Sequence, residues 1–189
     1  MTSVLVSGAE QQVSPVAEAL RARGAEVTAV VDLEDMPGVC AAAGPSAFDC
    51  YVQLASTFQM DGETVVERVH HFYANGVLAR FPALGAAVPA LTPEASITFV
   101  LGQLPAEVAS TDDRDARLSL TKVLAHAARA DAPAATFAVR VLTADATRED
   151  IVAAALGEVS SSRRLIDRLS DLEYADWRVE VLGIAALET

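Results

Sequence analysis

The sequence predicts a doubly wound parallel α/β sheet, with helices on both faces in three layers. Short runs of apolar and β-branched residues alternate with longer segments whose apolar residues recur at helical spacing. The first unit, β-α-β over residues 3–32, requires a crossover connection, and such connections join parallel strands. A chain of 189 residues fits one domain, so we expect residues 1–189 to form a single domain.

The remaining elements continue this alternation with two irregular stretches. Residues 33–47 are rich in Gly, Pro and Ala without a clear period, which indicates a shortened connection with at most one helical turn. The long helical pattern of residues 61–91 contains Pro82 and Pro89, which should kink or end the helix. Further strands are expected at 49–54, 96–101 and 136–142, further helices at 112–131 and 147–156, and a C-terminal helix and strand within 158–189, the strand over 177–185.

Composition excludes several classes of partner. The formal net charge is −12, and Arg163-Arg164 is the nearest approach to the basic patch that nucleic acid or an anionic membrane would need. No basic residue precedes the first apolar run, and no uncharged apolar stretch is long enough to span a bilayer, so the cytoplasm is the default location. Cys40 and Cys50 form no Cys-x2-Cys pair, and there is no histidine cluster. We therefore expect two buried free cysteines and no metal site.

Three segments, in this order, carry a resemblance to a known family. Residues 67–81 (ERVHHFYANGVLARF) look like a long fourth helix with Gly76 at its usual glycine, and residues 118–130 (LSLTKVLAHAARA) look like a helix with a Tyr-x-x-x-Lys pair. Residues 147–161 (TREDIVAAALGEVSS) are similar to a late helix that often reads Pro-Glu-Asp-Ile-Ala. Together, over about residues 3–157, they resemble the short-chain dehydrogenase/reductase (SDR) family, which implies a shortened, Rossmann-like SDR fold.

The resemblance places the family's catalytic groups at positions that have lost them. The general-acid tyrosine corresponds to Leu118, the serine falls near Gly102, and the helix asparagine aligns with Tyr73. Only Lys122 matches, and it is the only lysine of the chain. A leucine has no ionisable group, so Lys122 has no general acid whose pKa it could lower. We therefore predict that the chain has no functional catalytic residue.

The cofactor-binding turn of the family is also reduced. After the first strand only Gly8 remains, because Gln12 and Ser14 replace the other two glycines, and Glu10 adds a negative charge where the cofactor phosphates would lie. The strand and helix that flank the adenine in SDR proteins have no counterpart in residues 33–47. We therefore expect no bound cofactor, and NAD if any.

Two further positions keep two interpretations each. Asp32 either holds an adenosine ribose hydroxyl or is a solvated strand-end acid or helix N-cap. Lys122 either keeps a ribose contact or is an exposed helix cation. If a nucleotide binds, Gly8, Asp32 and Lys122 are the expected contacts.

Three functions are compatible with these predictions. The first is a non-catalytic scaffold or partner subunit of an active dehydrogenase, forming a homodimer or a heteromer with a related SDR through helices 61–91 and 112–131, which correspond to the family's dimer helices. The second is a sensor that binds NAD(P) or another small ligand without turnover. The third is an atypical NAD(P)-dependent oxidoreductase with Tyr51 or Tyr73 as acid, although the sequence offers neither tyrosine a neighbouring base or cation. Fold resemblance alone does not decide among them.

Overall fold

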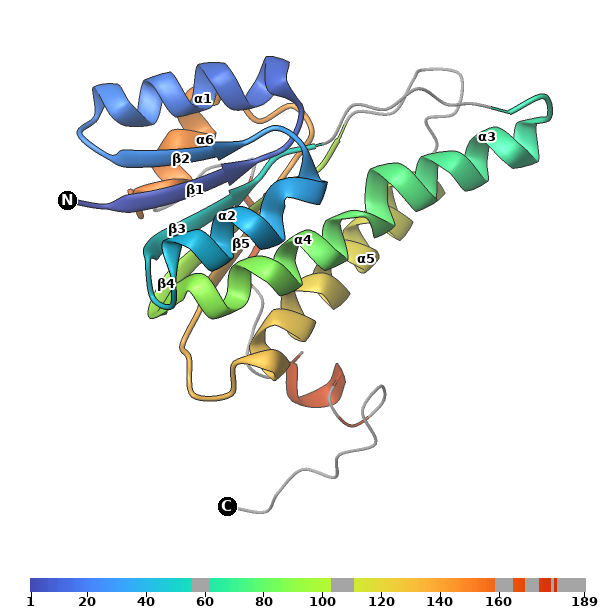
Figure 1. Ribbon diagram of the computed structural model, residues 1–189. Coiled ribbons are helices and arrows are strands. Elements are labelled where there is room, and N and C mark those ends of the chain that lie inside the picture. The colour runs from blue at the N-terminus through green and yellow to red at the C-terminus, as the bar shows by residue number, and fades with distance from the viewer. Residues whose placement is uncertain (56–61, 103–110, 159–164, 169–173, 178, 180–189) are drawn as a thin grey trace.

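A computed structural model of the chain describes residues 1–55, 62–102, 111–158, 165–168, 174–177 and 179. Six strands form one sheet in the order β2-β1-β3-β4-β5-β6 (Figure 1). The strands are β1 (Ser3–Ser7), β2 (Glu26–Val30), β3 (Phe48–Gln53), β4 (Leu91–Val100), β5 (Ala138–Leu142) and β6 (Leu165–Arg168). The first five are parallel, and β6 is antiparallel to β5. The parallel sheet confirms the predicted fold class.

Helices cover both faces of this sheet. The helical elements are α1 (Glu10–Ala22), η1 (Leu33–Asp35), α2 (Met36–Ala43), α3 (Val65–His71), η2 (Phe72–Leu78), α4 (Arg80–Ala87), η3 (Val88–Ala90), α5 (Thr111–Asp131) and α6 (Arg148–Ala155). α1 and α6 lie on one face, called here the α1–α6 face, and α2, α4 and α5 lie on the other, the α4–α5 face (Figure 1). The result is the expected three-layer α/β/α arrangement.

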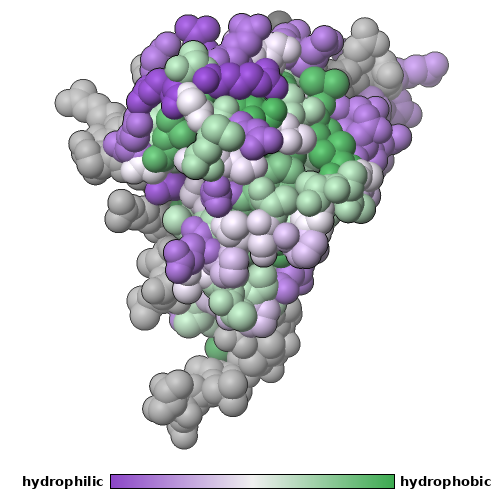
Figure 2. All heavy atoms as spheres, turned by 60° about the vertical axis from the view of Figure 1, so that its left-hand side comes forward, coloured by the Kyte–Doolittle hydropathy of each residue, from purple (hydrophilic) through white to green (hydrophobic). Residues whose placement is uncertain are grey.

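Each face has its own hydrophobic cluster, because the side chains of a strand alternate between the two faces. On the α1–α6 face the cluster is built mainly from valine, leucine and alanine, including Val6, Leu20 and Val52. On the α4–α5 face it is larger and contains the aromatic side chains of Tyr51 and Phe99. Figure 2 shows hydrophilic residues gathered over the top of the molecule, where α1 turns its polar side to solvent.

The connection between β2 and β3 is more helical than predicted. Residues 33–43 form a short 3-10 turn followed by α2, where we expected a loop with at most one turn. Met36 and Cys40, one turn apart, are buried in the cluster of the α4–α5 face, and this packing stabilises a helix that has little apolar periodicity of its own. Pro37 lies in the first turn of α2, where backbone N–H groups have no partner within the helix, so the N–H that proline lacks costs no hydrogen bond.

The same connection contains no strand, so β2 is an edge of the sheet. The absence of a strand agrees with the prediction for residues 33–47, whereas α2 is a helix that the prediction did not include. The side chain of Arg21, in the last turn of α1, donates a hydrogen bond from Nη2 to the carbonyl oxygen of Val27 in β2 at 3.0 Å. An arginine of α1 therefore occupies one backbone acceptor of this edge strand.

The helical run of residues 65–90 continues through Pro82, where the sequence predicted a kink or an end. Pro82 lies in the first turn of α4, where a helix tolerates proline. The preceding turns, η2, are π-helical, and the N–H of Ala79 donates to the carbonyl oxygen of Ala74 at 3.1 Å. The hydrogen-bonding pattern therefore changes at this point without ending the helix. In Figure 1 α3 projects well beyond the sheet.

The C-terminal elements differ from the prediction. A helix followed by a strand was expected, but β6 is a strand and residues 174–177 are helical. Trp177 is thus helical and does not begin a strand, while residues 178 and 180–185 of the expected strand lie outside the described part. The rings of Tyr174 and Trp177 stack on buried His126 of α5, with centroids 5.6 and 5.5 Å away. Contacts between residues far apart in the sequence can override local secondary-structure preferences, and a local sequence pattern does not reveal them.

Two further findings concern the predicted exclusions. Cys40 and Cys50 are both buried and free, as expected. Burial is the main reason that the pKa of Cys50 rises to about 11. Within the described ranges no helix has the length and apolarity to cross a membrane, and no group of three His, Cys, Asp or Glu side chains could hold a metal.

Candidate ligand-binding cavity

A cavity of about 510 Å³ opens at the carboxyl ends of the parallel strands. Ligands of open α/β sheets bind in this position, and the volume is within the range of small-molecule sites. Its walls come from α1, the ends of β3 and β4, the helical run of η2 and α4, α5, and the segment that enters α6. The described lining residues are Gln11, Gln12, Pro15, Val16, Leu54, Ala55, Phe72, Gly76, Val77, Arg80, Val100, Leu101, Gly102, Arg117, Thr121, Ala144, Ala146, Arg148 and Ile151.

Gly8 is required by packing at the turn beneath this cavity. Its φ is +142°, and a Cβ atom there would lie 2.7 Å from the Cβ of Leu54. The next residue, Ala9, donates its N–H to the carbonyl oxygen of Ala55 at 3.1 Å, which holds the turn against the end of β3. Gly8 is not among the lining residues, so a glycine is required here by backbone conformation and packing, independently of any nucleotide.

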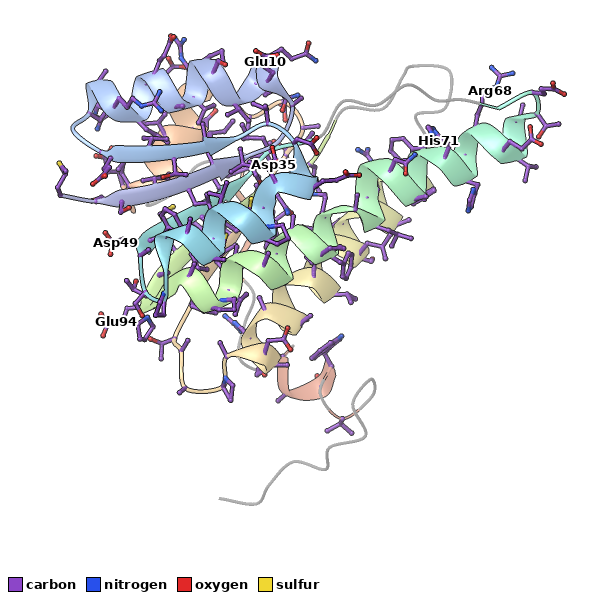
Figure 3. The ribbon with its side chains drawn as sticks, viewed as in Figure 1. Glu10, Asp35, Asp49, Arg68, His71 and Glu94 are labelled. Atoms are coloured by element: carbon purple, nitrogen blue, oxygen red, sulfur yellow. The ribbon has the colours of Figure 1, made fainter. Side chains whose placement is uncertain are left out.

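The α1 side of the cavity is polar but uncharged. Gln11 and Gln12 line it from the first turn of α1. Glu10 does not, because it is exposed and its side chain points away from the sheet (Figure 3). The negative charge that the sequence placed beside the cofactor phosphates is therefore directed to solvent.

A buried hydrogen-bond network joins the end of β3 to α4. Arg80, only 5% exposed, donates from Nε to Oε1 of Gln53 at 3.0 Å. Its Nη2 donates to the carbonyl oxygens of Gln53 and Val100, both at 3.1 Å. Gln53 returns a bond from Nε2 to the carbonyl oxygen of Arg80 at 3.1 Å. The two side chains thus fix each other, and Arg80 forms part of the cavity wall.

The network continues away from the cavity to Tyr51. Gln53 Nε2 donates to the Tyr51 hydroxyl at 3.0 Å, and that hydroxyl shares a 2.8 Å hydrogen bond with the Ser7 hydroxyl. Tyr51 is fully buried, and burial is the main cause that raises its pKa to about 12. Because Tyr51 is also absent from the cavity wall, the geometry gives no support to its role as a general acid.

Two side chains of α5 face the cavity, Arg117 and Thr121, four residues apart. Both are buried, at 8% and 4% exposed. An Nη1 of Arg117 donates to the carbonyl oxygen of Gly102, and the Thr121 hydroxyl donates to the carbonyl oxygen of Arg117 at 2.8 Å. The pair that the resemblance singled out, Leu118 and Lys122, lies one residue further along the helix and does not line the cavity.

Those two residues have other surroundings. Leu118 packs against the cluster of the α4–α5 face, and Lys122 is half-buried. A nucleotide contact of Lys122 stays a prediction. Arg117 and Thr121 could have been found by extending the buried face of α5 backward from Leu124 in steps of three and four residues, because all three lie on one side of the helix.

The third arginine of the cavity comes from the start of α6. Thr147 and Asp150 form a capping box, with the Asp150 N–H donating to the Thr147 hydroxyl at 3.2 Å and the Thr147 N–H donating to Asp150 Oδ2 at 2.8 Å. This fixes Arg148 as the first helical residue, at the mouth of the cavity. Its side chain is 54% exposed and lies 3.4 Å from Glu149, a contact of little energy at the surface.

The other predicted positions are spread around the site. Gly102 lines the cavity and accepts the hydrogen bond from Arg117. Tyr73 packs edge-on against Phe72, with ring centroids 5.3 Å apart, and is not a lining residue. Asp32 caps η1 by accepting a hydrogen bond from the N–H of Glu34 at 2.9 Å, which agrees with its N-cap interpretation. Its alternative role as a ribose contact stays a prediction.

The described wall of the cavity is therefore rich in arginine, in a protein with a net charge of −12. Its described wall carries three arginines and no acidic side chain. Nor does that wall contain a His, Lys, Cys or Tyr side chain. It offers positive charge and hydrogen-bond donors, but no group that exchanges a proton near neutral pH.

Comparisons with known proteins agree on the fold. Neither a protein-family profile nor a curated protein sequence matches the chain. Among solved structures, a small-chain dehydrogenase is 17% identical with a TM-score of 0.61, covering 85% of this chain and 90% of its own. A candidate short-chain alcohol dehydrogenase from Burkholderia multivorans is 11% identical with a TM-score of 0.57, covering 80% and 86%. BdcA in complex with NADPH is 14% identical with a TM-score of 0.51, covering 75% and 69%.

These likenesses define the class of fold. The chain has a short-chain-dehydrogenase-like, Rossmann-type α/β fold. At such low identity the similarity supports the fold and not an activity. Evidence on function therefore comes from the residues of the cavity.

Proposed function

We propose that this chain is a non-catalytic SDR-like protein whose cavity binds a ligand without turning it over. The single observation that supports this is the composition of the described cavity wall, in which the polar side chains are Arg, Gln and Thr. Carbonyl reduction needs a side chain that delivers a proton near the working pH, and none of these three does so. Oriented donors and positive charge remain, and these are the requirements of binding.

The neighbouring structure in complex with NADPH makes a nicotinamide cofactor the first ligand to test. The purified protein is incubated with NADH or NADPH and a panel of aldehydes and ketones, and with NAD or NADP and the matching alcohols, while absorbance at the nicotinamide band is followed. We expect no oxidation or reduction above a protein-free blank. Steady turnover that survives a second purification step and is lost in Arg117→Gln or Lys122→Ala would contradict the proposal.

A second candidate function is the scaffold or partner-subunit role predicted from helices 61–91 and 112–131. The projecting helix α3 supports it, because Val65, Val66 and Val69 are exposed there, Val66 by 78%. Figure 1 shows α3 extending past the sheet, with α4 and α5 side by side. Apolar residues gathered on a projecting helix are typical of a contact with another chain.

Light scattering during size-exclusion chromatography at micromolar concentration tests this candidate. We expect a dimer in which Val66→Glu lowers the mass to that of the monomer. Val31→Glu is the matched control, because Val31 is similarly exposed, at 52%, but lies beside β2. A monomeric wild-type protein that also copurifies with no SDR from its native host would remove the scaffold role.

A further inference from the structure

We propose that the cavity binds a compact organic anion, with a carboxylate- or phosphate-type head among Arg80, Arg117 and Arg148 and an apolar body. The inference rests on the proposed function, ligand binding without turnover, and names the chemical class of the ligand. It depends on the charge balance of one buried side chain and on the way in which two guanidinium groups are held together.

Arg80 is a buried charge with only neutral partners in the described part of the chain. Its Nε and Nη2 atoms bond to three amide oxygens of Gln53 and Val100. No described carboxylate lies within ion-pair distance of Arg80. Burial of a charge without a counter-ion is costly, so an anion supplied from the cavity would stabilise this arrangement.

Arg117 places a second positive charge at the same wall. Arg80 bonds to the carbonyl oxygen of Val100 and Arg117 to that of Gly102, two residues further along the chain. The end of β4 therefore holds both guanidinium groups near each other. Burial is the main cause that lowers the pKa of Arg80 to about 10, and the positive charge of Arg117 contributes to a smaller extent.

A guanidinium group presents donors in a plane that matches the oxygens of a carboxylate or a phosphate. Two such groups at one strand end, with Arg148 at the mouth, can surround one anionic head. The rest of the wall sets the body of the ligand. Val16, Leu54 and Ile151 are apolar and face the same cavity, so a purely inorganic ion would leave them exposed to water.

The distribution of charge favours a compact ligand over a dinucleotide. Arg80 and Arg117 come from α4 and α5, whereas the α1–α6 face offers Gln11, Gln12 and, at the start of α6, Arg148. A dinucleotide spans both sides of such a crevice and places its pyrophosphate at the first turn of α1. Here two of the three arginines lie on the α4–α5 face, away from that turn.

Isothermal titration calorimetry in low-salt buffer tests the inference with four probes: phenyl phosphate, 3-phenylpropionate, its neutral analogue 3-phenylpropionamide, and NADPH. We expect both anions to bind and the amide to bind at least about tenfold more weakly, because a charge-assisted bond to arginine is lost. Phenyl phosphate and phenylpropionate also distinguish a phosphate head from a carboxylate head.

Three variants connect the binding to the arginines. Arg117→Gln and Arg148→Gln should each weaken anion binding by about tenfold. Arg148 is at the surface, so its variant keeps the test valid even if Arg117→Gln folds poorly. Arg68→Gln is the matched control, because it removes the same charge from an exposed position of the projecting helix α3 (Figure 3) that is not a lining residue, and it should leave binding unchanged.

The possible results separate this inference from the proposed function. Absence of anion binding, or equal binding of the acid and its amide, would overturn the inference and leave non-catalytic binding or scaffolding untouched. Tighter binding of NADPH than of either small anion would refute the compact ligand. Turnover of the cofactor, in contrast, would refute the proposed function itself.

Discussion

The two faces of the sheet in this protein are built by different means. The α1–α6 face is packed with aliphatic side chains such as Val6, Leu20 and Val52, all buried. The α4–α5 face is larger, but it also encloses the hydrogen-bonded chain from Ser7 to Arg80. Both faces belong to the same parallel sheet, and alternate residues of β3 point to one or the other.

The two faces therefore contribute differently to the stability of the fold and to the position of the cavity residues. An aliphatic layer needs only matched volumes, whereas a buried polar network holds its shape only if every member has a partner. The polar network ends at Arg80 in the cavity wall, so the α4–α5 face positions this arginine. The α1–α6 face provides apolar packing on the other side of the sheet. Four changes test this division, in order of decreasing effect.

Arg80→Met should have the largest effect on stability. It removes three donated hydrogen bonds and leaves the buried acceptors of Gln53 and Val100 without partners. We expect a loss of about 4 kcal/mol in the free energy of unfolding. Urea denaturation followed by far-UV circular dichroism measures this quantity. A loss below about 1 kcal/mol, within the range of an ordinary substitution, would mean that the polar network does not organise this face.

Leu20→Ala tests the aliphatic face by cavity formation alone. Leu20 is fully buried between α1 and the sheet, so we expect a loss of about 3 kcal/mol. Leu78→Ala is the matched control, because Leu78 is 49% exposed and its replacement should cost less than about 0.5 kcal/mol. Equal losses for the two variants would show that α1 is not packed as described.

Alkaline pH should weaken the α1–α6 face through Cys50. Its pKa is raised, mainly by burial, from 9.0 to about 11, so the folded state keeps a thiol proton that the unfolded state loses. This contribution is complete below pH 9 and disappears as the pH rises to 11, at a cost of about 2 kcal/mol. Cys50→Ala should flatten the decline of the free energy of unfolding in this window.

The α4–α5 face titrates in two opposing ways in the same range. The raised pKa of Tyr51 causes a further loss of stability towards pH 12. The lowered pKa of Arg80 acts in the opposite sense above pH 10, because the unfolded state then binds more protons than the folded state. Urea titrations of Cys50→Ala between pH 8 and 11 separate these effects, and an unchanged slope would exclude Cys50 as the cause.

Thr98→Val should give the smallest change and the opposite sign. Thr98 lies on β4 between Ile97 and Phe99, which face α4 and α5, so its own side chain faces the aliphatic layer. Its hydroxyl is buried and has no hydrogen-bond partner in the described part of the protein. Valine has nearly the same shape, and we expect a gain of about 1 kcal/mol. A loss in thermal or urea unfolding would show that the hydroxyl has a role.

Much of this architecture could be predicted from local patterns. Strands β1 to β5 are short β-branched runs separated by crossover helices, and Thr147 with Asp150 announces the start of α6. The elements that escaped prediction depend on distant contacts. Helix α2 is stabilised by the burial of Met36 and Cys40, and β6 by its pairing with β5.

The cavity was harder to predict than the fold. Alignment by resemblance selected Leu118 and Lys122, whereas the neighbouring positions Arg117 and Thr121 line the cavity. An offset of one residue rotates a helix by about 100°, so a small error of register changes which side chains face the ligand. Arg80 did carry a signal, since no other Asp, Glu, Lys or Arg lies between Arg68 and Glu94 and the following residues 81–91 are all apolar or small. A lone charge in such a stretch indicates a buried one.

The shortened connection after β2 leaves this strand at the border of the described sheet. A strand at the border of a sheet offers unsatisfied backbone groups on which a second molecule could extend the sheet. Here Arg21 occupies the carbonyl oxygen of Val27 and places a positive charge along that border. The absence of a further strand thus leaves an open border on the described sheet, and a single side chain of the adjoining helix covers part of it.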